Sequence, residues 1–147
     1  MKLKTVGNLI KFLKEKKSLP VGTFVECTRK FTIEDTKKFA ELTGDSNPIH
    51  TDYDAAIAMD HPAPLVHGLL ASSIFPAFFG ANLPGSLYVS QTLKFNAPIY
   101  VDETVRIRLE LKSQKRNLIE CTSVVYKDNE VVEAITGVSR VWIPHFP

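Results

Sequence analysis

The sequence predicts an α+β domain in which an antiparallel sheet wraps around a long apolar helix. In the first half of the 147-residue chain the apolar residues recur at helical spacing. After the break at 83–85, apolar and polar residues alternate with the period of two that is typical of strands. Between the halves, residues 67–79 are apolar nearly all round. Such a helix has no face for water, so other elements must enclose it.

The composition fits one globular domain and excludes several classes of protein. Hydrophobic residues make up 44% of the chain and charged residues 23%, which is ordinary for such a domain. The two cysteines, Cys27 and Cys121, have no metal-ligand spacing and make no disulfide framework. The net charge of +2 comes from a basic segment, residues 1–17, on a mildly acidic remainder. We therefore expect no nucleic-acid partner, because nucleic-acid binding needs basic groups over the whole docking face.

Residues 1–20 form a basic segment that we expect to lie outside the domain proper, which then occupies residues 21–147. Within it, Leu3, Val6 and Ile10 have the spacing of an amphipathic helix, with lysines between them. A basic amphipathic segment poor in acids is typical of mitochondrial targeting, although this one lacks arginine. The alternative is a surface helix packed on the domain, or a basic tail. We expect a mitochondrial location, with a cytoplasmic one as the alternative.

The first elements of the domain carry clear start and stop signals. Residues 23–31 alternate and are rich in β-formers, which predicts a strand. Thr32-x-x-Asp35 resembles a capping box and should open a helix of about ten residues. Gly44 should end that helix as a C-cap, before a polar loop over residues 45–53.

A short helix over residues 55–59, capped by Asp54, should precede the long apolar helix. Pro76 should kink the apolar helix, because proline lacks the N–H that the helical hydrogen bond needs. We expect no membrane span, since the densest apolar stretch, residues 65–79, falls short of the roughly 20 residues that cross a bilayer. Strands should follow at residues 87–95, 105–111, 118–126 and 131–142, with a turn at 127–130 between the last two.

The richest chemical pattern is the segment after Gly44, where Asp45, Asn47 and His50 fall within six residues. Pro48 stiffens this loop. A stiff loop that carries an acid and an imidazole suits proton transfer to one small reactant such as water. Asn47 can donate and accept hydrogen bonds that fix the geometry. The alternative is that Asp45 and Asn47 only serve the helix end and its turn.

A second pattern lies at the start of the apolar helix. Gly68 would allow a ligand oxygen to approach backbone N–H groups that have no partner within the helix. Such an N–H can stabilise a developing oxyanion. Alternatively, Gly68 is small only to permit packing. For the adjacent His67, a structural hydrogen-bonding role is the expectation.

Together these patterns resemble the MaoC-like hydratases, also called type-2 or (R)-specific enoyl-thioester hydratases. The resemblance covers nearly all of residues 21–147 and rests on three motifs in order. They are Phe39-x-x-Leu42-Thr43-Gly44-Asp45-x-Asn47-Pro48-x-His50, then Val66-His67-Gly68-Leu69-Leu70, then Pro84-Gly85-x-x-Tyr88-x-x-Gln91-x-Leu93-x-Phe95-x-x-Pro98.

The resemblance implies a hot-dog fold and the reversible syn-addition of water to a trans-2-enoyl thioester, giving the (3R)-3-hydroxyacyl thioester. Asp45 and His50 would be the catalytic pair. Asn47 and the backbone N–H of Gly68 would bind the substrate, Asn47 by positioning the pair and Gly68 by holding the thioester carbonyl. No metal or other cofactor is implied. Pro76 departs from some bacterial members, which carry a small polar residue there, and this leaves the shape of the acyl pocket open.

The acyl group could be carried on coenzyme A or on acyl carrier protein. We expect the 3-hydroxyacyl-carrier-protein dehydratase of mitochondrial type-II fatty acid synthesis, with a short-chain (R)-specific enoyl-CoA hydratase as the alternative. Between Lys94 and Lys127 the basic residues outnumber the acidic ones. This excess could meet an acidic carrier or simply be a solvated strand face. A hot-dog thioesterase and a non-catalytic binding module remain further alternatives. A homodimer is expected because it would close the sheet edges.

Overall fold

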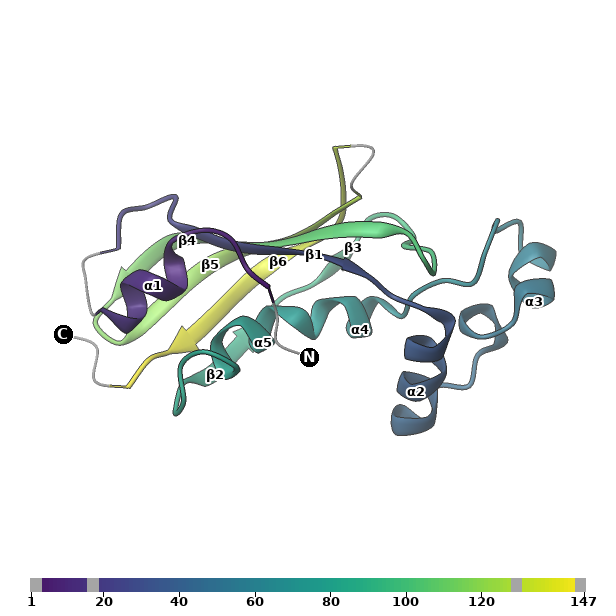
Figure 1. The fold of residues 1–147 in the computed structure, drawn as a ribbon, viewed down its shortest axis with the longest axis horizontal. Helices are drawn as coiled ribbons and strands as arrows, with labels where there is room; N and C mark the ends of the chain where they lie inside the picture. The colour runs from purple at the N-terminus through teal and green to yellow at the C-terminus, as the bar shows by residue number, and fades with distance from the viewer. Residues whose placement is uncertain (1–3, 16–18, 128–130, 145–147) are drawn as a thin grey trace.

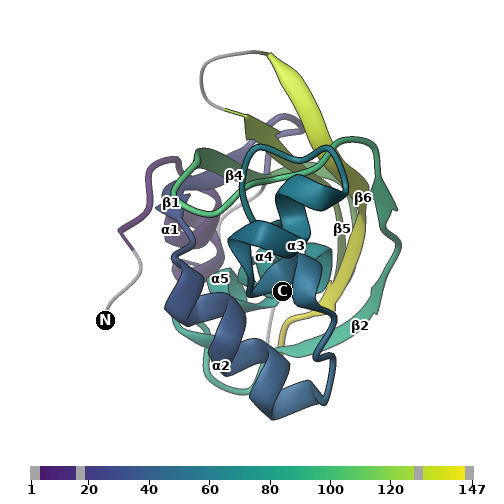
Figure 2. The same cartoon turned by 90° about the vertical axis from the view of Figure 1, so that its right-hand side faces the viewer.

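A curved antiparallel sheet of six strands encloses two short helices, as Figure 1 shows from the side and Figure 2 from the end. The computed structural model describes residues 4–15, 19–127 and 131–144. The strands lie in the order β1-β4-β5-β6-β2, and β3 also pairs with β6. This α+β architecture is the hot-dog fold that the sequence predicted. The strands are β1 Phe24–Lys30, β2 Leu87–Gln91, β3 Lys94–Phe95, β4 Thr104–Lys115, β5 Leu118–Lys127 and β6 Val132–Trp142.

The inner face of the sheet follows from the alternation in the sequence. In β4, Val105, Ile107 and Leu109 are fully buried, while the arginines between them point outward. β4 and β5 pair over nearly their whole length, with Leu109 opposite the buried Ser123. Of the turn expected at residues 127–130, residues 128–130 lie outside the described residues. The four predicted strand regions of the second half are confirmed, with 87–95 divided into β2 and β3.

The predicted apolar helix consists of two helices, α4 (Gly68–Ser72) and α5 (Ile74–Gly80). The interruption at Ser73 lies three residues before Pro76. Proline at position 76 has no N–H for the carbonyl of Ser72 and its ring clashes with that carbonyl, so the kink falls one turn earlier in the chain. Phe75 is fully buried against the sheet, as expected. Leu69 is an exception to the apolar-all-round expectation, since most of its side chain is exposed.

The capping signals of the first half are largely confirmed. Helix α2 (Ile33–Thr43) begins with a complete capping box between Thr32 and Asp35 and ends at Gly44 in the left-handed conformation. A single 3-10 turn, η1 (Pro48–His50), follows. The expected cap of the next helix is wrong. Helix α3 spans Tyr53–Ala58, and its N-cap is Asp52, whose Oδ1 accepts a hydrogen bond from the N–H of Ala55.

The described part of the basic N-terminal segment, residues 4–15, lies within the fold, not outside it as expected. Helix α1 (Leu9–Lys14) buries Leu9, Ile10 and Leu13 in the main hydrophobic core. Just before it, Val6 pairs with Glu26 of β1 through two backbone hydrogen bonds. Helix α1 contacts β1, and Figures 1 and 2 show the two elements close together. The domain boundary expected at residue 21 is therefore wrong, because apolar spacing cannot distinguish an exposed amphipathic arm from a helix that completes a core.

In strand β2 the alternating apolar residues point away from the core. Leu87 and Val89 are more than half exposed, while Tyr88 is partly buried against the core. A register shift between Tyr88 and Ser90 changes the pairing with β6. The outcome is an exposed apolar face at the edge of the sheet.

Among the described residues, no helix is long and apolar enough to cross a membrane.

Candidate active site

A cavity of about 500 Å³ lies where the loop after α2, the start of α4 and strand β3 meet. Its walls are mostly apolar, with a few polar side chains among them, as in many small-molecule sites. Three of the residues singled out from sequence, Asp45, His50 and Gly68, line this cavity together with His67. The remaining wall residues are Phe39, His61, Leu65, Val66, Leu69, Phe95, Asn96, Ala97, Pro98, Ile99 and Ile135.

The loop after Gly44 holds Asp45 through its own backbone. The N–H of Asp45 donates to Thr43 Oγ1 at 3.3 Å, and the N–H of Asn47 donates to Asp45 Oδ1, also at 3.3 Å. The Asp45 side chain remains about half exposed. An ionised carboxylate in such a position keeps lone pairs free to accept a proton or a hydrogen bond from a ligand.

Asn47 lies outside the cavity wall and instead shapes the loop. Its Oδ1 accepts a hydrogen bond from the N–H of Ile49 at 3.3 Å, which caps the 3-10 turn. Its carbonyl oxygen accepts from the N–H of His50 at 3.1 Å. Asn47 thus links the backbone that carries Asp45 to the turn that carries His50.

The hydrogen bonding of His50 fixes its tautomer. Its Nδ1 lies 2.9 Å from the carbonyl oxygen of Leu65. Because a carbonyl oxygen can only accept, the proton of the neutral ring resides on Nδ1, and Nε2 keeps its lone pair. The N–H of Leu65 in turn donates to the carbonyl of Ile49, so one backbone and one side-chain hydrogen bond tie the turn to Leu65. His50 can therefore act as a base through Nε2.

His67 is a site residue that sequence reasoning missed. We expected a structural hydrogen-bonder, but neither ring nitrogen has a hydrogen-bond partner among the described residues. The ring is buried and stacks on His50 with a centroid distance of 3.8 Å, and its Nε2 lies 3.7 Å from Asp45 Oδ2. Burial, and then the neighbouring His50, lower the pKa of His67 below its ordinary value. Its place directly before Gly68, at the N-cap of α4, was the available signal.

Gly68 has both a backbone N–H without a helical partner and a close packing contact that leaves no room for a side chain. It is the first residue of α4, so its N–H has no partner within the helix. A Cβ at this position would collide with the ring of Phe95 from β3. Phe95 is itself more than half exposed and lines the cavity beside Gly68. The lack of a side chain thus allows β3 to approach the start of the helix closely.

Asp45, His50 and His67 offer ligand atoms that all lie within 4.8 Å of one another, so a metal ion has to be considered. The two imidazole planes are only 24° apart and stacked. The lone pairs of stacked rings lie in their planes and run side by side, whereas metal ligands must direct their lone pairs to one point. The arrangement therefore suits proton transfer better than metal coordination.

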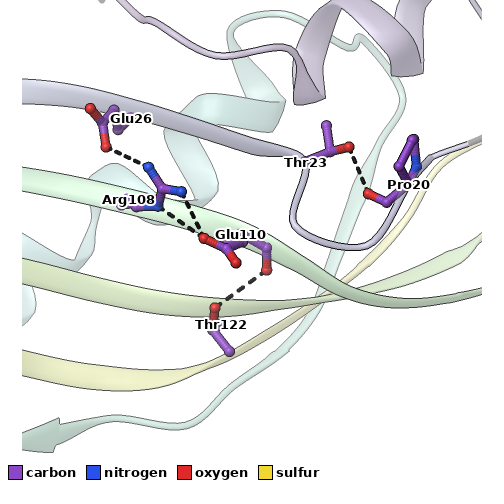
Figure 3. A network of polar contacts seen from close by, with 6 residues as sticks. All are labelled: Pro20, Thr23, Glu26, Arg108, Glu110 and Thr122. Atoms are coloured by element: carbon purple, nitrogen blue, oxygen red, sulfur yellow. Dashed lines mark hydrogen bonds and ion pairs between the residues drawn. The ribbon is translucent and has the colours of Figure 1, made fainter.

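Three of the seven basic residues between Lys94 and Lys127 form ion pairs with carboxylates on or beside the sheet. Figure 3 shows Arg108 between Glu26 and Glu110, at N–O distances of 3.0 and 2.7 Å. Lys112 pairs with Glu120, and Lys127 with Glu103. These three cations are engaged within the chain, so the ion pairs account for part of the basic excess and leave its role open to the carrier test.

Comparison with known proteins identifies the family. Residues 18–134 match the MaoC-like domain. The chain belongs to the MaoC-like family. A mitochondrial 3-hydroxyacyl-[acyl-carrier-protein] dehydratase of Arabidopsis thaliana is 31% identical to this MaoC-like chain over 131 residues, which cover 86% of the chain and 79% of the relative. An (R)-specific enoyl-CoA hydratase of Aeromonas caviae is 30% identical over 86% of the chain and 97% of its own length.

Solved structures agree with this assignment of the MaoC-like chain. The (R)-hydratase from A. caviae superposes with a TM-score of 0.81 at 30% identity, covering 86% of the chain and 98% of that protein. An R-hydratase from Pseudomonas aeruginosa superposes with a TM-score of 0.79 over 96% of the chain and 89% of that protein. At 24% identity this second likeness concerns the fold alone.

Proposed function

We propose that this MaoC-like protein is a (3R)-3-hydroxyacyl-thioester dehydratase, which in reverse is an (R)-specific trans-2-enoyl-thioester hydratase. The observation that carries the proposal is the convergence of Asp45 and His50 on one mostly apolar cavity, with His50 Nε2 unprotonated. Relatives of matching length are named as dehydratases and hydratases of this class. Such enzymes are hydro-lyases.

The chemistry needs only proton transfers and one developing negative charge. In hydration, the Asp45/His50 pair takes a proton from water as its oxygen bonds to C3, and the pair returns a proton to C2. In dehydration the same pair removes the C2 proton and protonates the departing 3-hydroxyl. As C2 loses or gains its proton, the thioester carbonyl takes on enolate character, and we assign the N–H of Gly68 to that oxygen. Asn47 positions the pair through the loop backbone. Atoms balance with water alone, so the proposal includes no metal or other cofactor.

We propose acyl carrier protein as the physiological carrier, in the dehydratase step of type-II fatty acid synthesis. Two relatives are named as mitochondrial 3-hydroxyacyl-[acyl-carrier-protein] dehydratases, one of Arabidopsis thaliana and one of Solanum lycopersicum. The chain covers 79% of the first but only 53% of the second. Coenzyme A is the competing carrier, because the hydratase of Aeromonas caviae is named for enoyl-CoA.

The location we propose is mitochondrial, again on the strength of those two relatives. Packing of α1 into the core disfavours residues 1–20 as a free targeting arm. Fusing residues 1–20 to a fluorescent reporter decides the role of this segment. A diffuse cytosolic signal would leave the location to be explained by other means.

A homodimer is the proposed assembly. The exposed apolar side chains Leu87 and Val89 on β2 lie at the edge of the sheet, and Phe95 on β3 is also exposed. An unpaired strand edge with apolar neighbours is a template for pairing with another chain. A second copy of this chain would cover it with an identical edge.

The test of function is the hydration of crotonyl-CoA by the purified protein, followed as loss of enoyl-thioester absorbance while free thiol is measured in parallel. The proposal predicts loss of the enoyl signal with no thiol release. Thiol release would indicate a thioesterase, and no reaction with any enoyl thioester would indicate a binding module. Comparison of kcat/KM for one acyl chain on coenzyme A and on acyl carrier protein then tests the carrier.

A further inference from the structure

His67 lies in the wall of the cavity with its polar atoms unused. Its side chain is only 3% exposed, and its two ring nitrogens lack a hydrogen-bond partner within residues 4–15, 19–127 and 131–144. A buried polar atom left unpaired is destabilising, so a native structure that keeps one needs a reason. Because His67 lines the same cavity as Asp45 and His50, that reason is to be sought at the reacting centre.

Two contacts tie His67 to the proposed catalytic pair. Its ring stacks on that of His50, with an angle of 24° between the planes. Its Nε2 lies 3.7 Å from Asp45 Oδ2, which is longer than a hydrogen bond. Catalytic hydrogen bonds are often long without substrate and shorten when it binds, and a water molecule can also bridge such a gap. The ring of Phe39 further confines His67, with 4.9 Å between the two ring centroids.

We propose that His67 is a positioning residue for the hydration site, whose ring supports the face of His50 and whose Nε2–H is directed to the carboxylate of Asp45. This inference rests on the proposed function. It assigns His67 no proton transfer of its own, since it would act on the substrate only through the other two side chains.

The surroundings of His67 favour a neutral ring. Four ionisable side chains line the cavity: Asp45, His50, His61 and His67. His61 is engaged with the hydroxyl of Tyr100 at 3.2 Å. The pKa of His67 is lowered first by burial and then by His50, and these outweigh Asp45, which raises it. The net direction favours an uncharged ring when His50 carries the proton in transit. A neutral ring can stack on a charged imidazolium, whereas a second positive charge at this distance would repel it.

A pair of variants separates positioning from packing. His67→Phe keeps an aromatic ring for the stack but removes the N–H, whereas His67→Gln restores an amide donor near the position of Nε2. We expect H67F to lower kcat about 10- to 100-fold with KM changed less than about threefold, in keeping with the cost of misplaced reacting groups. We expect H67Q to recover several-fold of that loss. If H67F is as active as wild type, or H67Q is no better than H67F, the inference is overturned.

A double-mutant cycle adds a control that a purely structural role would not satisfy. If His67 acts through Asp45, then H67F should reduce the residual rate of Asp45→Asn by less than about twofold. Equal losses in the two backgrounds would overturn the inference. If wild type shows no hydratase activity at all, it is the proposed function that has failed.

Nuclear magnetic resonance of protein labelled with ¹⁵N-histidine tests the inference without substrate and without any variant. We expect His67 to stay neutral below its ordinary titration range, with its proton on Nε2, while His50 carries its proton on Nδ1. A His67 ring that carries its proton on Nδ1 would contradict the proposed contact with Asp45. A ring that titrates at or above its ordinary pKa would contradict the neutral state that the inference requires.

Discussion

Asp45 and His50 reach one cavity from positions with different constraints. Asp45 is half exposed and held by loop backbone, whereas the carbonyl of Leu65 fixes the tautomer of His50. The exposed carboxylate keeps lone pairs available to a ligand, and the unprotonated Nε2 of His50 can accept a proton. This division lets the pair handle both protons of a water addition.

Replacement of either member should abolish most of the activity. We expect Asp45→Asn and His50→Gln each to lower kcat for crotonyl-CoA by about a hundredfold or more, the usual worth of a positioned acid or base. Asp45→Asn is nearly isosteric, whereas His50→Gln loses the ring that stacks on His67. Unfolding temperatures near that of wild type therefore serve as the control for both variants. Folded variants that keep wild-type rates would exclude this pair.

At the scale of residues, the sequence could predict that Asp45 and His50 lie near each other, because the two are also close along the chain. Asp45 and His50 are close in sequence on a stiff loop, so their meeting in one cavity could be anticipated. His67 comes 17 positions after His50, and its stacking depends on how α4 meets the 3-10 turn. No local pattern contains that information.

Among the elements, α1 belongs to the core although the local sequence pattern did not indicate this. Its lysines suggested an arm, but Leu9 is fully buried and Leu13 nearly so. The short helix has little intrinsic stability, so burial of these side chains against the sheet must hold it in place. The kink of the central helix, by contrast, could be predicted, since Pro76 acts through its own backbone chemistry.

A substitution in α1 tests whether it belongs to the core. We expect Leu9→Ala to lower the free energy of unfolding by about 2–5 kcal/mol, the usual cost of truncating a buried leucine. Leu42→Ala is the matched control, because Leu42 is 83% exposed and its change should stay within about 0.5 kcal/mol. Equal stabilities of the two variants in chemical denaturation would mean that α1 is not part of the folded core.

At the scale of the whole molecule, the exposed apolar face of β2 suggests that a single copy lacks a partner that covers this face. Apolar and polar residues alternate along this strand, and the structure leaves the apolar side chains of Leu87 and Val89 exposed to solvent. The pattern is consistent with burial in an assembly. Alternation of apolar and polar residues is the same whether the apolar face is buried in the core of one chain or in an interface between two chains, so it could not distinguish the two.

Light scattering coupled to size exclusion tests the assembly. We expect wild type at twice the chain mass of 16.4 kDa. Val89→Lys should shift it toward the monomer, because a charge placed in an apolar interface is strongly unfavourable. Lys112→Ala, on the outer face of β4, is the control and should leave the dimer intact. A monomeric wild type would refute the dimer.

The measurement that bears most directly on the central claim is the configuration of the hydration product. Crotonyl-CoA is incubated with the protein, and the 3-hydroxybutyryl thioester that forms is resolved by chiral chromatography. The account predicts the (3R) product alone from wild type, and almost none from Asp45→Asn or His50→Gln. A (3S) product, a mixture of the two configurations, or no hydration by the folded wild-type protein would contradict it.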